Sequence, residues 1–136
     1  MFSQKSFSAD AYKQVGVETE IQTADPHRLI LLLLDGAIVG LSEALLHMEA
    51  NQIGKKGSCI SKAIDIIANG LKVSVDRESG GDLALRLIAL YDYMCIRLLH
   101  ANMKNDQAAI KEVVSLLREI HSAWTQIGQT VAAGRT

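Results

Sequence analysis

The residues best suited to catalysis or metal binding are four histidines and two cysteines, which are spread along the chain. A carboxylate-bridged metal site in a helical bundle needs Glu-x-x-His spacing on two helices. Here Glu43 and His47 are four positions apart, and Glu119 and His121 are two apart. The zinc-protease pattern His-Glu-x-x-His does not occur. The sequence therefore predicts no metal site and no cofactor.

Nucleophilic catalysis has no signature either, because Gly-x-Ser-x-Gly is missing and neither Cys59 nor Cys95 has a base beside it in the sequence. The pair Gly80-Gly81 lacks the Lys-Ser/Thr of a phosphate-binding loop, and Asp82 would repel a phosphate. We predict no catalytic residues. We expect the two cysteines to be small buried residues in a reducing, cytoplasmic compartment, the alternative being a disulfide or a metal site.

Two aspartates stand among apolar neighbours. Asp35 interrupts a leucine-rich run, and Asp92 lies between Tyr91 and Tyr93. Burying an unpaired carboxylate costs several kcal/mol, so each should reach solvent or a partner. They are either surface carboxylates with a structural hydrogen bond or polar anchors at the rim of an apolar groove.

Composition limits the fold that must position these residues. The chain has 136 residues, the size of one domain, with 49% hydrophobic and 21% charged residues, which excludes a wholly disordered chain. A single proline and 4% aromatic residues are unfavourable for a β-sandwich and suit an all-α fold. The net charge of -1 makes nucleic acid an unsuitable partner.

The apolar periodicity predicts four helices joined by short connections, hence an antiparallel up-down-up-down four-helix bundle. Asp25-Pro26 should start the first helix, which runs to about Asn51; Ser58 should cap the second, which ends near Asp76. The third follows a break over residues 78–82, and Asp106 caps the fourth. We expect a flexible N-terminal arm over 1–24, a bundle over 25–131 and a frayed tail over 132–136. The last two helices, joined by the shortest loop, should form the tightest hairpin.

The first and third helices carry more apolar residues than one buried stripe needs. Residues 29–34 are all apolar and point around the helix axis. In the third helix the expected buried stripe is Leu83, Leu87, Leu90, Met94, Leu98 and Ala101, and the surplus residues are Leu85, Ile88, Tyr91, Cys95 and Leu99. Asp35 interrupts the longest apolar run, so no membrane span is expected, and residues 1–7 lack the continuous apolar stretch of an export signal. A surplus apolar face is covered by the arm, by a second copy or by an amphipathic partner segment.

Several strings in fixed order resemble the FliS family of flagellin export chaperones. They are Ala11-Tyr12, Asp25-Pro26, Asp35-Gly36-Ala37-Ile38, Gly80-Gly81-Asp82-Leu83-Ala84, Leu90-Tyr91-Asp92-Tyr93-Met94 and Asn105-Asp106. The resemblance implies a cytoplasmic binding protein, not an enzyme. Such a protein holds the unfolded C-terminal segment of flagellin, prevents premature polymerisation and supports delivery to the flagellar type III export gate. Two features depart from the family: Leu34 stands where many members have an aromatic residue, and the arm lacks an Asn-Pro-Tyr opening.

With this resemblance, helix phase gives a predicted partner-binding site. Its groove wall is Leu31, Ile38, Ile88, Tyr91 and Cys95, and its polar anchors are Asp35 and Asp92. In the arm, Tyr12 and Val17 form a displaceable plug. The competing interpretations are a helical adaptor that acts through homodimerisation and, more weakly, a small enzyme whose site is assembled from distant residues.

Overall fold

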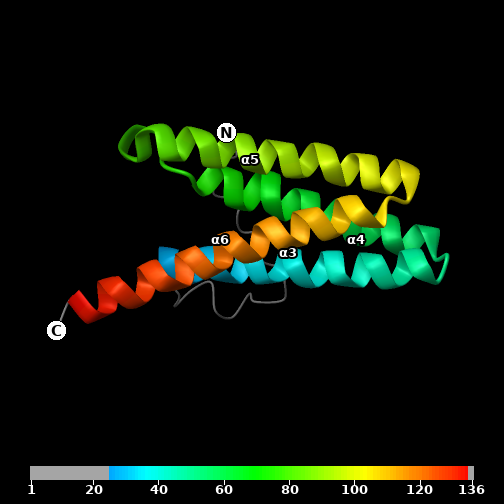
Figure 1. Ribbon diagram of the computed structural model, residues 1–136, viewed down its shortest axis with the longest axis horizontal. Helices are drawn as coiled ribbons and strands as arrows, with labels where there is room; N and C mark the ends of the chain where they lie inside the picture. Colours follow the sequence, from blue (N-terminus) through cyan, green and yellow to red (C-terminus); the bar gives the residue numbers. More distant parts are fainter. Residues whose placement is uncertain (1–24, 135–136) are drawn as a thin grey trace, which may run out of the picture.

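Four helices that run alternately in opposite directions make up the part of the chain that the structure describes (Figure 1). The computed structural model describes the backbone of residues 25–134 and the side chains of residues 25–129. The helices are α3 (Pro26–Glu49), α4 (Ile53–Ile66), α5 (Arg77–Lys104) and α6 (Gln107–Gly134), and α4 continues through a π-helical turn, η1 (Ile67–Leu71), and a 3-10 turn, η2 (Lys72–Ser74). The predicted all-α antiparallel bundle is confirmed. The arm, with Tyr12 and Val17, lies outside the described residues.

The first and last helices begin where their capping residues predict. The Asp25 carboxylate accepts a hydrogen bond of 2.8 Å from the Arg28 N–H, and Pro26 occupies the first helical position. At α6, the Asp106 carboxylate accepts from the Ala109 N–H at 3.2 Å. Both carboxylates satisfy donors that a helix leaves unpaired.

The second helix begins earlier than the sequence predicts. It starts at Ile53, after a turn of only three residues, and not after a cap at Ser58. The reason is tertiary: Lys56 is 2% exposed, and its Nζ donates to the Asn102 carbonyl oxygen at 2.9 Å and to Asn105 Oδ1 at 2.6 Å. This anchor holds the glycine-containing first turns against the end of α5, where helix propensity alone would not favour them.

The expected break before the third helix is reduced to a kink. Asp76 caps a first turn by accepting from the Glu78 and Ser79 N–H groups, so residues 77–80 are already helical. Gly81 then has φ 55° and ψ -136°, a conformation open to glycine. The helix direction is therefore reset at Gly81, before the long apolar part of α5.

The core follows the predicted stripes on three helices and departs from them on α5. Buried positions of α5 are Ala84, Ile88, Tyr91, Met94, Leu98 and Ala101. Leu83, expected in the core, is 74% exposed, whereas Ile88 and Tyr91, expected among the surplus residues, are buried. In α6, Ile110, Val113 and Leu117 are buried as predicted, and Ile127 is half-exposed. Both cysteines are free and only partly buried, not fully buried as expected.

Each helix packs against two neighbours, so α3 and α5 occupy opposite corners of the bundle. The most extensive contact joins α3 and α4, which corrects the expectation that α5 and α6 form the tightest hairpin. Small residues explain this: a Cβ on Gly40 would lie only 3.9 Å from the Cys59 carbonyl oxygen, so the two backbones approach closely. Only Asn105 and Asp106 separate α5 from α6, and the connection from η2 to α5, which consists of Val75 and Asp76, is equally short.

One helix among the described residues, α3, is long and apolar enough to cross a membrane by length and composition. The single charge of Asp35 does not take α3 below that limit, but the core helix of a soluble protein can have the same length and composition. The bundle accounts for the apolar character of α3 because Leu33, Leu34, Ala37 and Leu41 are completely buried in the shared core. Core helices of globular proteins commonly have this composition.

Candidate functional site

An apolar row runs along the outside of α5. It consists of residues three and four positions apart, which share one helix face: Leu85, Ala89, Asp92, Ile96, Leu99 and Met103. We call this row the outer α5 stripe. Its four large apolar side chains, Leu85, Ile96, Leu99 and Met103, are each more than half exposed. Such a row on a bundle surface is typical of a binding face.

Three residues of the predicted groove wall lie beneath or beside this stripe. Ile88 and Tyr91 are buried, and Cys95 is partly buried against the core. Burial raises the pKa of the Tyr91 phenol to about 12. Burial, and then the nearby Asp92 carboxylate, raise the pKa of the Cys95 thiol. These residues support the stripe from below, and both titratable groups are neutral at physiological pH.

Asp92 gives the stripe a charged edge. Its carboxylate pairs with Lys72 Nζ of η2 at 2.7 Å, and about half of its side chain is exposed. Both ions remain in contact with solvent, so the pair contributes little to stability. It is available as a polar anchor for a partner segment.

The predicted residues of α3 form a second, separate group. Leu31, Asp35 and Ile38 share one side of α3, and Asp35 pairs with His121 Nε2 of α6 at 2.9 Å. Leu31 and Ile38 are partly buried against the core. Because Asp35 pairs with α6 whereas Asp92 pairs with η2, the structure divides the predicted site between two sides of the bundle.

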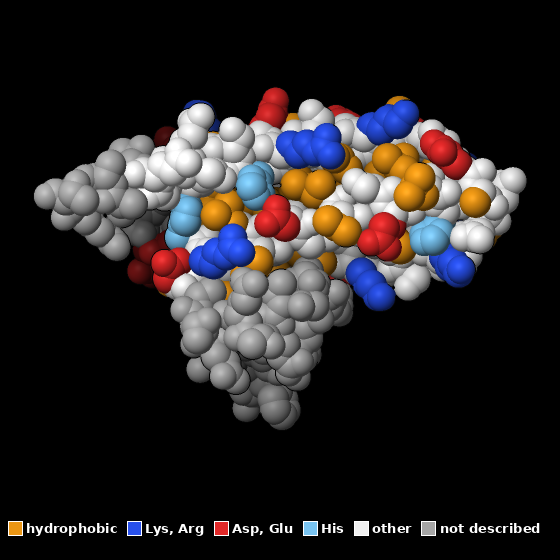
Figure 2. Space-filling view, turned by 90° about the horizontal axis from the view of Figure 1, so that it is seen from below, with side chains coloured by type: hydrophobic (Ala, Val, Ile, Leu, Met, Phe, Trp, Pro, Cys, Tyr) orange, Lys and Arg blue, Asp and Glu red, His pale blue; other side chains and the backbone are white. Residues whose placement is uncertain are grey.

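The two sides differ in character. Figure 2 shows the underside of Figure 1, where α3 and α6 lie, and there hydrophobic side chains alternate with acidic, basic and histidine side chains. A cavity of ≈ 480 Å³ between these helices is likewise lined mainly by polar residues, among them Ser42, Lys111 and Arg118. The outer α5 stripe is the more continuous apolar surface.

Tyr91 also lines an apolar cavity at the end of the bundle where α3 begins. The cavity is ≈ 260 Å³, and its lining includes Ile30, Leu71, Leu87, Ile120 and Trp124. The Trp124 indole stacks on His27 with ring centroids 5.3 Å apart, and its N–H donates to the His27 carbonyl oxygen at 3.2 Å. This cavity is itself an apolar pocket, and Tyr91 of the buried α5 wall forms part of its lining.

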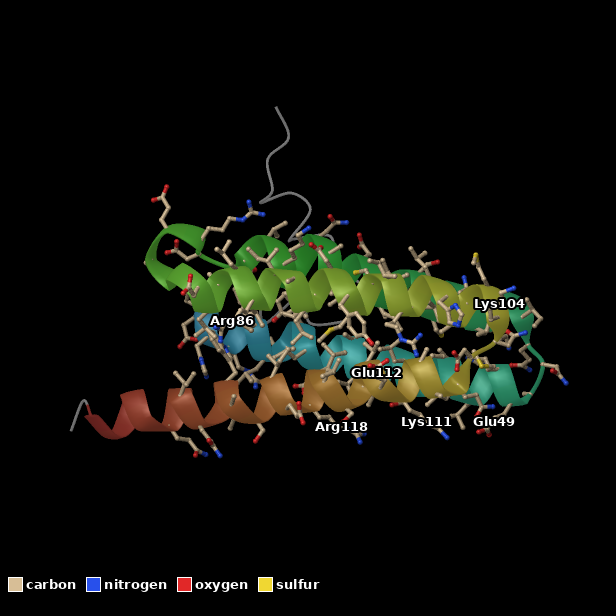
Figure 3. All side chains as sticks on the ribbon, turned by 45° about the horizontal axis from the view of Figure 1, so that its top comes forward. Glu49, Arg86, Lys104, Lys111, Glu112 and Arg118 are labelled. Atoms are coloured by element: carbon tan, nitrogen blue, oxygen red, sulfur yellow. The ribbon has the colours of Figure 1, made fainter. Side chains whose placement is uncertain are left out.

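On the side of α5 that faces α6, a polar cluster fixes the two helices. Glu112 of α6 accepts from the Tyr93 hydroxyl at 2.6 Å and from Arg97 Nε at 2.8 Å. Figure 3 shows Glu112 directed toward α5, whereas Lys111 and Arg118 project from the outer side of α6. The cluster joins the two helices in the rotation that leaves the stripe on the outside of α5.

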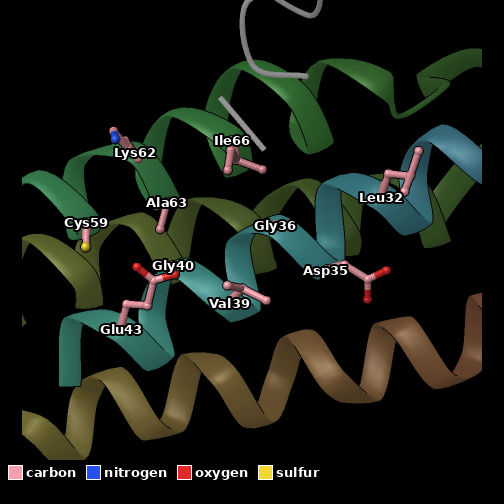
Figure 4. Close-up of a pocket in the computed structure, with 10 residues that line it drawn as sticks. All are labelled: Leu32, Asp35, Gly36, Val39, Gly40, Glu43, Cys59, Lys62, Ala63 and Ile66. Atoms are coloured by element: carbon pink, nitrogen blue, oxygen red, sulfur yellow. The ribbon is translucent and has the colours of Figure 1, made fainter. Parts of the chain in front are cut away.

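A further group of side chains was missed by sequence reasoning. Glu43, His47 and Cys59 bring one potential ligand atom each to within 4.8 Å of one another. Glu43 and Cys59 also line a cavity of ≈ 330 Å³ between α3 and α4 (Figure 4). The spacing of Glu43 and His47 was noted in the sequence, but the third member comes from another helix. Only the packing of α4 on α3 reveals it.

Comparison with known proteins agrees with a binding role. The family model described as "Flagellar protein FliS" matches residues 8–131. The chain is 51% identical over 117 residues to the flagellar secretion chaperone FliS of Salmonella typhimurium, covering 86% of this chain and 87% of that protein. It is 47% identical over 116 residues to that of Escherichia coli, covering 85% of each. Identity to the Bacillus subtilis protein is 32% over 120 residues, 88% of this chain and 85% of the relative.

Proposed function

Because this chain belongs to the FliS family of flagellar secretion chaperones, we propose that it binds the disordered C-terminal segment of flagellin and keeps it competent for export. The family is cytoplasmic and non-enzymatic, in agreement with the lack of any catalytic motif in the sequence. Bound in this way, flagellin is prevented from polymerising before it reaches the flagellar type III export gate, which we propose as the second partner.

The observation that carries this proposal is the outer α5 stripe. Ile96, Leu99 and Met103 stand more than half exposed with the spacing of a helix-binding seam. A disordered client segment would form a helix on this surface and bury the stripe, the usual way in which an amphipathic helix binds an apolar face. Ordering the segment costs about 2–5 kcal/mol of the gross interaction energy.

The predicted contacts follow from the same placement. We propose that Ile88, Tyr91 and Cys95 form the floor of the α5 surface and that Asp92 anchors its edge. We propose Leu31, Asp35 and Ile38 as a second contact surface on α3. Since the two surfaces lie on different sides of the bundle, a single client segment must wrap around the protein to reach both.

The N-terminal arm is the proposed competitor for these surfaces. In this proposal Tyr12 and Val17 occupy part of the apolar surface when no client is bound and leave it when flagellin arrives. The support is the resemblance to the family and the sparsely apolar composition of residues 1–24.

Calorimetric titration of the full chain with a peptide of the host flagellin's C-terminal segment tests the proposal. Ile96→Glu should weaken binding about tenfold or more by placing a charge within the contact surface. Leu46→Glu is the matched control, because Leu46 on α3 is also 65% exposed but lies about two helical turns beyond Ile38, the last residue of the proposed α3 surface. Equal effects of the two substitutions, or no binding by the unsubstituted chain, would contradict the proposal.

A second experiment addresses the floor of the α5 surface and Asp92 at its edge. Tyr91→Ala is a poor probe because Tyr91 is 2% exposed and its loss would unfold much of the core. Asp92→Asn changes only the exposed edge and should reduce affinity without altering the thermal midpoint of the free protein.

The molecular mass of the free chain, measured over a range of concentrations, tests the alternative of a homodimeric adaptor. A stable dimer that buries the stripe would favour that alternative.

A further inference from the structure

A mixed set of nitrogen, sulfur and oxygen donors gathers where α3 and α4 meet near their connecting turn. Glu43 and His47 are one helical turn apart on α3, and Cys59 faces them from α4. One donor atom from each residue lies within 4.8 Å of the other two. Imidazole, thiolate and carboxylate together are the donor set preferred by Zn²⁺, and tetrahedral coordination places ligand atoms roughly 3.5 Å apart. Small side-chain rotations suffice to close that difference.

The histidine of this group is already oriented by a second residue. His47 Nδ1 lies 2.9 Å from Gln52 Oε1. An amide oxygen only accepts, so this hydrogen bond uses Nδ1 as the donor and leaves Nε2 as the nitrogen that can coordinate a metal ion. Metal-binding histidines are usually held in this way, with the second ring nitrogen donating to an oxygen. Gln52 is the residue that immediately precedes α4, so the turn itself sets the ring orientation.

The two helices that carry these three residues are closely packed, and the Glu43 carboxylate gives the site a negative charge that suits a cation. Helices α3 and α4 make the most extensive packing contact in the described bundle, and at Gly40 the backbone of Cys59 comes close. Figure 4 shows the Glu43 carboxylate directed toward Cys59, and Lys62 lines the same cavity. The site is partly open: Glu43 is exposed and the other two residues are half-buried, so a metal ion and a water ligand have access.

From these observations we infer that Glu43, His47 and Cys59 bind one Zn²⁺ ion, with water as the fourth ligand, and that the ion links α3 to α4. The apolar cavity with Tyr91 and Trp124 lies at the other end of the bundle, lined by the first turns of α3 and the residues around η2. None of the three proposed metal ligands is a proposed client contact, although Asp35 of the α3 contact surface lines the same cavity as Glu43 and Cys59. The inference does not depend on the proposed function.

Cobalt titration of the full chain, prepared without a histidine tag, is the primary test. Co²⁺ should give a near-ultraviolet thiolate charge-transfer band together with tetrahedral visible bands, and equimolar Zn²⁺ should abolish both. The charge-transfer band identifies a cysteine ligand directly, which simple surface adsorption would not produce. Calorimetry with Zn²⁺ should give one site per chain.

The chain offers matched controls for both informative ligands. Cys59→Ser should abolish the charge-transfer band, whereas Cys95→Ser, which changes the other partly buried free cysteine, should retain it. His47→Gln should weaken Zn²⁺ binding about tenfold or more, and His100→Gln should leave it unchanged. His100 is a suitable control because its imidazole contacts Asp106 at 3.2 Å and because it is far from Cys59 in the sequence.

Three results would overturn the inference. They are the absence of a cobalt spectrum in folded protein, a spectrum that survives Cys59→Ser, and a Zn²⁺-dependent dimer in which two chains share the ion. Circular dichroism of each variant checks that the helices persist. Gln52→Ala serves as a further variant that touches no ligand: loss of the hydrogen bond to His47 should weaken binding roughly tenfold without removing the cobalt bands.

Discussion

At the scale of single residues, Lys56 shows how one buried cation fixes a helix start. Its Nζ bridges the Asn102 carbonyl oxygen and Asn105 Oδ1 from the first turns of α4. Lys56→Met keeps the length of the side chain but leaves these oxygens without their donor, so the free energy of unfolding should fall by about 1–3 kcal/mol. Lys55→Met, at an exposed neighbouring position, is the control in chemical denaturation and should change little. Equal losses of unfolding free energy in the two variants would show that the Lys56 hydrogen bonds do not contribute to stability.

Acid stability depends on carboxylates that the fold keeps ionised. Hydrogen bonds from the Tyr93 hydroxyl and Arg97 lower the pKa of Glu112, Ser79 lowers the pKa of Asp76, and the Ala109 N–H lowers that of Asp106. A lowered folded pKa adds stability above the unfolded pKa of roughly 4, and this stability is lost as pH falls through the folded value. The protein should therefore weaken progressively on acidification below that point.

Glu112→Gln tests this pH dependence, since the amide still accepts hydrogen bonds but no longer titrates. Denaturation measured from neutral pH to about pH 2 should show a lower stability than that of the unsubstituted chain at neutral pH and a shallower decline in acid. Tyr93→Phe removes only one of the two donors and should give an intermediate profile. Parallel profiles for all three proteins would contradict the assigned cause.

Individual site residues were predictable from the sequence only in part. Asp35 and Asp92 were expected to find partners or solvent, and both do: Asp35 contacts His121 Nε2, and Asp92 forms an exposed ion pair with Lys72. The identity of those partners was not predictable, because each comes from a different helix or turn. The same reason hid Cys59 as a neighbour of Glu43 and His47.

At the scale of elements, two glycines in helices should respond to alanine with opposite signs. Gly81 has a positive φ, and a Cβ there would meet nothing within 4 Å, so its effect is purely conformational. Gly81→Ala should cost about 1–3 kcal/mol of stability. Gly54, inside α4 and equally open, should gain up to about 1 kcal/mol from alanine because helix propensity improves. Thermal or urea unfolding measures both, and effects of the same sign would contradict the assigned kink.

Helix α5 shows why the rotation of a helix about its axis was harder to predict than the presence of the helix. The expected and observed buried rows share Met94, Leu98 and Ala101 but differ toward the N-terminus, where Ile88 and Tyr91 replace Leu87 and Leu90 as the most buried positions. Because α5 is apolar on several sides, its sequence fits more than one rotation. The observed rotation is accompanied by the contact of Glu112 with Tyr93 and Arg97 and by the kink at Gly81, and neither feature is encoded in apolar periodicity.

At the scale of the whole molecule, chain order and direction were predictable because short connections leave little choice for four amphipathic helices. Which two helices pack most extensively was not predictable, because this depends on small residues that meet across α3 and α4. The surplus apolar surface was also predicted, including Leu85 and Leu99 of the outer α5 stripe. The division of this surface between α3 and α5 was not predictable, because it depends on how the helices pack in the bundle.

The proposed arm predicts an effect of truncation on client affinity. If residues 1–24 cover part of the client surface, only uncovered chains bind, and the apparent affinity falls by the covered fraction. Deleting these residues should therefore strengthen binding of the flagellin peptide in calorimetry. Tyr12→Ala with Val17→Ala in the full chain should have the same direction of effect. Unchanged or weaker binding in both variants would reject the competition.

Coupled folding of the client gives the last prediction at this scale. A disordered peptide that becomes helical on the outer α5 stripe buries Leu85, Ile96, Leu99 and Met103 together with its own apolar face. Removing apolar surface from water lowers the heat capacity, so calorimetry at several temperatures should give a clearly negative heat-capacity change. The far-ultraviolet circular dichroism of an equimolar mixture should exceed the sum of the separate spectra, because the peptide gains helix. Ile96→Glu should reduce both signals together, since one surface produces both, whereas Leu46→Glu should leave them intact. Binding with additive spectra would mean that the client remains extended and that the stripe serves another partner.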